Sequence, residues 1–169
     1  MLWRLRDAAP AALVPAAWLA TAAAHADALP EEGMFVAHLV MAAFIAFFAV
    51  TGWSAMANGA LRAWRLVLAT GFCLTVVGIG GFLFPSVETP LLTTSLVGWM
   101  VLPAAGLAYT ARELPEARLV YDGGAALSVL GAVLYLLTVP LDSGALSAGA
   151  FVCVGAGPAA RILPASAWA

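Results

Sequence analysis

The sequence predicts an all-α polytopic membrane protein, a bundle of six short transmembrane helices. Hydrophobic residues make up 64% of the 169-residue chain and charged residues only 9%, and the mean hydropathy is +1.01. A soluble domain of this length needs many more charges to cover its surface, whereas a bilayer accepts an apolar exterior. The composition therefore indicates contact with a lipid bilayer.

Six apolar segments follow one another along the chain, each about as long as a helix that crosses the hydrocarbon. They are expected at 9–26, 34–57, 63–84, 91–111, 118–139 and 144–161. The last is rich in Gly and Ala and only weakly apolar, so a re-entrant helix is kept as an alternative to a full span. Because the connecting loops are short, residues 1–169 are predicted to form one transmembrane domain.

The basic residues, all of them arginines, indicate the orientation, because short cytoplasmic loops collect Arg and Lys while exported loops avoid them. With six spans, one side of the membrane holds Arg4, Arg6, Arg62, Arg65, Arg112, Arg118 and Arg161. The opposite loops hold acids and no arginine. We therefore predict a multi-pass protein of the cell membrane with both termini in the cytoplasm.

The N-terminus has a second interpretation, a secretory signal peptide. Arg4 and Arg6 precede an Ala-rich apolar run with an A-x-A triplet at 24–26, the pattern of a cleavage site. Cleavage after Ala26 would leave five spans and an exported N-terminus. Asp7 and two prolines interrupt the run, so a retained first span is favoured.

An internal repeat is indicated when the sequence is aligned with itself at an offset of 53 residues. The matched pairs are Arg65 with Arg118, Gly71 with Gly124, Thr75 with Ser128 and Gly78 with Gly131, and a two-residue slip adds Val97 with Val152. Spans three and four would then form a hairpin that spans five and six repeat in parallel. Chance similarity between apolar helices is the alternative.

Small residues at matched depths in this repeat are the expected helix contacts, because they let backbones approach closely in lipid. The predicted packing residues are Gly71, Gly78, Gly124, Ser128 and Gly131. If the hairpins instead enclose a transport pathway, hydroxyl groups would line it, and the candidates are Thr75, Thr94 and Ser128.

Catalytic motifs are absent from the sequence: there is no G-x-S-x-G, H-E-x-x-H or Walker-type loop, and no carboxylate pair at mid-membrane depth. Asp122 is the sole acid inside an expected span, and a solvated ion pair with Arg118, four residues earlier, accounts for it. The sequence therefore predicts a non-enzymatic protein without a cofactor.

A metal site on the exported side is a further hypothesis. Met34, His38 and Met41 are spaced i, i+4, i+7 on one helical face, and His25 lies across the turn. Thioethers with imidazole suit Cu(I), and imidazole with loop acids suits Zn(II). The alternative is that the methionines pack against neighbours and His38 bonds to a loop acid.

The function favoured by the sequence is a membrane scaffold or small subunit that works by helix–helix contact. Its expected partners are the bilayer and a second copy or another membrane subunit. A net charge of −2 without a basic run excludes nucleic acid. A small permease or channel is the alternative function, and metal binding is the second alternative.

Overall fold

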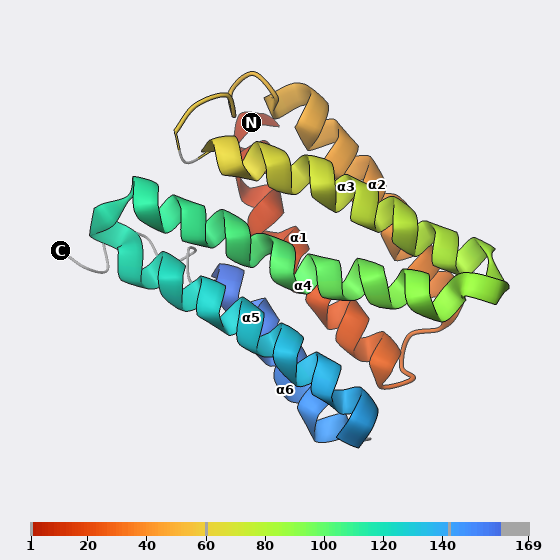
Figure 1. Cartoon of the computed structure of the whole chain (residues 1–169). Helices are drawn as coiled ribbons and strands as arrows, with labels where there is room; N and C mark the ends of the chain where they lie inside the picture. Colours follow the sequence, from red (N-terminus) through yellow and green to blue (C-terminus); the bar gives the residue numbers. More distant parts are fainter. Residues whose placement is uncertain (1, 60, 142, 160–169) are drawn as a thin grey trace.

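The computed structural model describes the backbone of residues 2–59, 61–141 and 143–159. Throughout this part the chain is helical, with six α-helices, two short 3-10 helices and no strand (Figure 1). The α-helices are α1 (Leu2–His25), α2 (Glu31–Gly52), α3 (Leu61–Leu83), α4 (Glu88–Glu113), α5 (Arg118–Leu141) and α6 (Gly144–Ala159). Each of the six expected segments corresponds to one of them, so the all-α prediction is confirmed.

Local chemistry sets the helix ends. α2 begins after Pro30, whose extended backbone ends the preceding turn, and Glu31 and Glu32 occupy its first turn, where they oppose the positive end of the helix dipole. The 3-10 helices η1 (Pro85–Val87) and η2 (Pro115–Ala117) each begin with proline and join α3 to α4 and α4 to α5. Short turns of this kind bring consecutive helices into antiparallel contact (Figure 1).

Four helical segments are long and apolar enough to cross a membrane: α2, α3, α4 together with η1 (Pro85–Glu113), and η2 with α5 to Thr138 (Pro115–Thr138). A shorter apolar stretch, Gly144–Ala156, lies in α6. The architecture is that of a helical membrane bundle. This finding covers the described residues, and the count of six spans stays a prediction.

Neighbouring helices pack in chain order from α2 to α6, and α1 returns to lie against α6 and, less closely, α2 (Figure 1). The core lies where α1, α4, α5 and α6 meet. Its buried members are Trp18, Met100, Ala132, Phe151 and Val154. α2 lies at the outside of this arrangement, and Ile45 is its one buried residue.

The outer surface is apolar. Val50 on α2 is 82% exposed and Leu119 on α5 is 88% exposed, and many other Leu, Val and Phe side chains are also exposed. Water would make this surface prone to aggregation, whereas hydrocarbon solvates it without cost.

Candidate functional site

Glycines let the helices of the bundle approach closely. Each of the predicted packing residues is buried: Gly71, Gly78, Gly124, Ser128 and Gly131. A Cβ on Gly78 would lie 2.7 Å from Ser95 Oγ of α4, and one on Gly131 would lie 2.8 Å from the Ala150 carbonyl oxygen of α6. A side chain at Gly131 has no room unless the backbone of α6 moves, whereas one at Gly78 would have to displace the side chains of Ser95 and His38.

Two tryptophan–threonine pairs join α3 to α4, and we call them the Trp–Thr clasps. In one clasp, Trp99 Nε1 of α4 donates to Thr75 Oγ1 of α3 at 3.1 Å. In the other, Trp64 Nε1 of α3 donates to Thr110 Oγ1 of α4, also at 3.1 Å. The bonds therefore run in both directions between the antiparallel helices.

Each clasp is completed within its own helix. Thr75 Oγ1 donates to the Gly71 carbonyl oxygen at 2.9 Å, and Thr110 Oγ1 donates to that of Gly106 at 2.8 Å. Thr75 and Thr110 are both buried. Each hydroxyl thus acts as donor and acceptor at once, which is what a polar group inside hydrocarbon requires.

The sequence analysis missed these clasps, although the sequence carries a pattern for them. The spacing W-x6-G-x3-T occurs at Trp64 with Gly71 and Thr75, and again 35 residues later at Trp99 with Gly106 and Thr110. Because consecutive helices run antiparallel, the two copies face each other in opposite directions.

The α5–α6 hairpin repeats only part of the arrangement. Ser128 is buried and its Oγ donates to the Gly124 carbonyl oxygen at 3.0 Å, as Thr75 does to Gly71. No tryptophan reaches Ser128 among the described residues. In this hairpin Gly131 of α5 lies close to Ala150 and Val154 of α6.

His38 lies on α2 and faces α3 and α4. Its Nδ1 is 2.9 Å from the Met34 carbonyl oxygen, and since a carbonyl only accepts, Nδ1 carries the proton. Its ring meets that of Phe82 edge-on with 5.1 Å between centroids. Nε2 lies 2.9 Å from the position of a Cβ on Gly78, beside the buried Ser95.

His25 ends α1 and contacts α5 and α6. Its Nδ1 donates to the Thr21 carbonyl oxygen at 2.9 Å, which leaves Nε2 to accept from the Tyr135 hydroxyl at 3.3 Å. The imidazole also packs edge-on against Phe151, with 4.8 Å between ring centroids. This contact attaches the end of α1 to the rest of the bundle.

The residues of the metal hypothesis therefore have different surroundings. His25 faces Tyr135 and Phe151, while His38 faces Gly78 and Phe82. Met34 and Met41 are half-buried. Within the described residues, no group of three or more His, Cys, Asp or Glu side chains is placed to hold a metal ion.

The candidate pathway residues are also in different surroundings. Thr75 and Ser128 are fully buried, each in its own hairpin, whereas Thr94 is exposed on α4. The expected ion pair on α5 is present, with Arg118 Nε 3.1 Å from Asp122 Oδ2 and both side chains largely solvent-facing. It is a surface pair of small energetic weight.

Comparison with protein-family models, with curated proteins and with solved structures gives no match for this chain. The class of the protein rests on its own geometry. It is a helical membrane bundle in which the buried hydroxyls of Thr75, Thr110 and Ser128 donate to carbonyls of their own helices, and those of Thr75 and Thr110 also accept from a neighbouring helix.

Proposed function

We propose that the protein is a non-enzymatic membrane scaffold or small subunit that acts by helix–helix contact. The observation that carries this proposal is the bonding of three of the four buried hydroxyls in the described residues. Thr75, Thr110 and Ser128 each donate to a carbonyl of their own helix, and both threonines also accept an indole N–H. A pathway for a polar solute needs hydroxyls that can exchange partners with water and the solute. In this protein the three hydroxyls are instead bonded to the helices themselves.

The proposal includes six spans with both termini in the cytoplasm. The α2–α3 and α4–α5 connections lie at the same end of the bundle (Figure 1), and Arg62, Arg65, Arg112 and Arg118 belong to these ends of the helices. α1 counts as a span because Trp18 is buried in the core and His25 bonds to Tyr135. A cleaved signal peptide would take both contacts away.

The proposal also includes duplication of the α3–α4 hairpin as α5–α6. Two matched positions support it: Gly71 accepts from Thr75 and Gly124 accepts from Ser128, and the offset of 53 residues relates both the glycines and the hydroxyl residues. Gly78 and Gly131 also meet matched residues of the next helix, Ser95 and Ala150, when the two-residue slip is included. The α5–α6 hairpin has no counterpart of Trp64 or Trp99 at the matched positions.

Cysteine labelling separates a scaffold from a permease. In a chain with Cys73→Ala and Cys153→Ala, single cysteines are introduced as Thr75→Cys and Ser128→Cys and treated with a membrane-impermeant maleimide. A scaffold leaves both unlabelled, because neither position meets water. Labelling of both on the folded protein would contradict the scaffold and support a pathway between the hairpins.

Two further positions serve as controls and test the orientation. Ser86→Cys, in the exposed turn between α3 and α4, is expected to react from outside intact cells. Asn58→Cys, exposed between α2 and α3, is expected to react only after the membrane is permeabilised. The reverse pattern would overturn the orientation with cytoplasmic termini.

A scaffold or subunit must also be found in a complex. The mass of the protein, solubilised from its native membrane in mild detergent, is expected to exceed that of one 17.3 kDa chain with its bound lipid and detergent. A monomer that conducts a solute in proteoliposomes would contradict the proposal.

The metal hypothesis would be favoured instead if the protein binds copper or zinc and His38→Ala abolishes that binding. The ligand atom available for this is the Nε2 of His38.

A further inference from the structure

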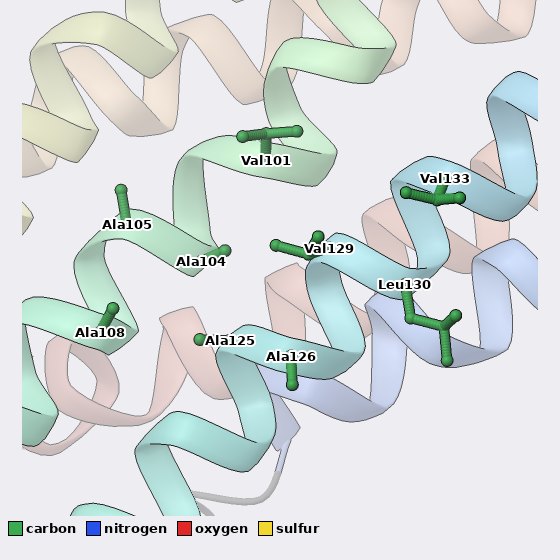
Figure 2. Close-up of a pocket in the computed structure, with 9 residues that line it drawn as sticks. All are labelled: Val101, Ala104, Ala105, Ala108, Ala125, Ala126, Val129, Leu130 and Val133. Carbon is green, nitrogen blue, oxygen red and sulfur yellow. The ribbon is translucent and has the colours of Figure 1, made fainter.

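An apolar groove runs along the outer surface of the bundle between α4 and α5 (Figure 2). Its lining consists of Ala and Val with one Leu: Val101, Ala104, Ala105, Ala108, Ala125, Ala126, Val129, Leu130 and Val133. No aromatic or polar side chain contributes to it. Figure 2 shows short side chains on both walls, so the groove owes its width to alanine.

Both walls of the groove continue into charged residues at the end where α4 and α5 are joined. On α4, Ala105, Ala108 and Arg112 are spaced i, i+3, i+7 and lie on one face. On α5, Ala126, Asp122 and Arg118 follow at intervals of four. An elongated apolar surface thus ends in a cluster of opposite charges.

The two arginines at this end can bind a further anion. Arg112 is exposed and makes no ion pair or hydrogen bond with another described residue. Arg118 uses its Nε for Asp122 and keeps its terminal N–H groups, in a side chain that is 69% exposed. Guanidinium groups bind phosphate oxygens strongly because two parallel N–H groups match them.

Acids are also present at this end of α4 and α5 and restrict the headgroup. Glu113 and Glu116 are exposed in the connection between α4 and α5, and Asp122 lies beside Arg118. These carboxylates repel a headgroup with a net negative charge but attract an ammonium group beside the phosphate. The charges therefore fit a zwitterionic headgroup, with its phosphate at the arginines and its amine at the acids.

We propose that this groove binds one zwitterionic aminophospholipid in the leaflet at the arginine-bearing end of the bundle. One acyl chain lies along the alanines between α4 and α5. The phosphate is held by Arg112 and Arg118, and the ammonium group meets the neighbouring carboxylates. The lipid then fills the space that the short side chains leave open in the α4–α5 contact.

Native mass spectrometry of the full-length chain in detergent, titrated with dioleoylphosphatidylethanolamine, tests the headgroup contact. One lipid is expected to remain bound per chain, and Arg112→Gln is expected to weaken binding about tenfold. The matched control is Arg62→Gln, which removes an exposed arginine from the start of α3 and is expected to leave binding unchanged. Equal losses in both variants, or none in Arg112→Gln, would overturn the proposal.

The groove itself is tested by filling it. Ala126→Leu is expected to reduce lipid occupancy about tenfold, whereas Ala43→Leu, on the exposed face of α2, is expected to leave it unchanged.

Tighter binding of phosphatidylglycerol than of phosphatidylethanolamine would contradict the zwitterionic assignment. A lipid-free dimer that Ala126→Leu dissociates would assign the groove to a second copy of the chain. Arg112→Gln, at the surface, keeps the test valid if Ala126→Leu does not fold.

Discussion

Thr75 and Thr110 hold the contact between α3 and α4 through hydrogen bonds that pass in both directions across the hairpin. Each hydroxyl accepts an indole N–H from the opposite helix and donates to a carbonyl of its own. Interhelical hydrogen bonds in bilayers contribute about 0.6 kcal/mol on average. Two of them stabilise this hairpin beyond its packing.

Thr75→Val removes one clasp while keeping the shape of the side chain. We expect the free energy of unfolding in detergent to fall by about 1 kcal/mol, because the Trp99 indole N–H is left without its acceptor. The control is Thr94→Val, at an exposed position on α4, which is expected to have little effect. A cost for Thr94→Val as large as that for Thr75→Val would contradict the role of the clasp.

Two glycines of α5 differ sharply in their surroundings. A Cβ on Gly131 would meet the Ala150 carbonyl oxygen, which belongs to a backbone that cannot rotate away, whereas a Cβ on Gly123 would meet nothing within 4 Å. We expect Gly131→Ala to destabilise the bundle by about 2 kcal/mol and Gly123→Ala to be neutral or slightly stabilising. Thermal unfolding of the two variants measures the difference, and similar transition temperatures would show that α6 does not pack closely there.

The small residues at the helix contacts could be predicted from the sequence, because the depth of a residue in the membrane and its face of the helix follow from helical periodicity. The residue that each side chain contacts on another helix could not be predicted in this way. Met34, His38 and Met41 do follow one another at helical spacing, but His38 lies against Gly78 and Phe82 of α3 because of how α2 packs on α3. His25 turns to Tyr135, which lies 110 residues away in sequence.

At the scale of the elements, hydropathy and turn residues located the six helices, and the differences lie at their ends. α1 begins at Leu2, although the apolar run was expected from 9, and α2 ends at Gly52, although 57 was expected. Hydropathy reports where a segment is apolar, whereas hydrogen bonding continues a helix into polar residues such as Arg4 and Arg6. Within the described residues, four helical segments are long and apolar enough to span a membrane by themselves, and a shorter apolar stretch lies in α6.

α1 is attached to the bundle mainly by Trp18, which is 9% exposed and packs with Phe151 in the core. We expect Trp18→Ala to lower the free energy of unfolding by about 3 kcal/mol. Leu19→Ala is the matched control, because Leu19 is 71% exposed, and its effect is expected to stay below about 0.5 kcal/mol. If both substitutions cost the same, α1 does not pack as the structure describes.

For the whole molecule, the distribution of charge and the direction of the helices agree. The connections that bear Arg62, Arg112 and Arg118 lie at one end of the bundle, and the acids Glu31 and Glu88 begin helices at the other (Figure 1). The proposal of six spans accounts for this arrangement, because it places the arginines on the cytoplasmic side together with both termini. The central claim is that α1 is one of those six spans and a permanent part of the core.

The intact mass of the protein purified from its native membrane tests that claim most directly. We expect a mass that includes residues 1–26, since Trp18 and His25 then remain against Phe151 and Tyr135. A mass that lacks residues 1–26 would contradict the account, because the bundle would lose α1, the core would be open at α6, and five crossings would remain.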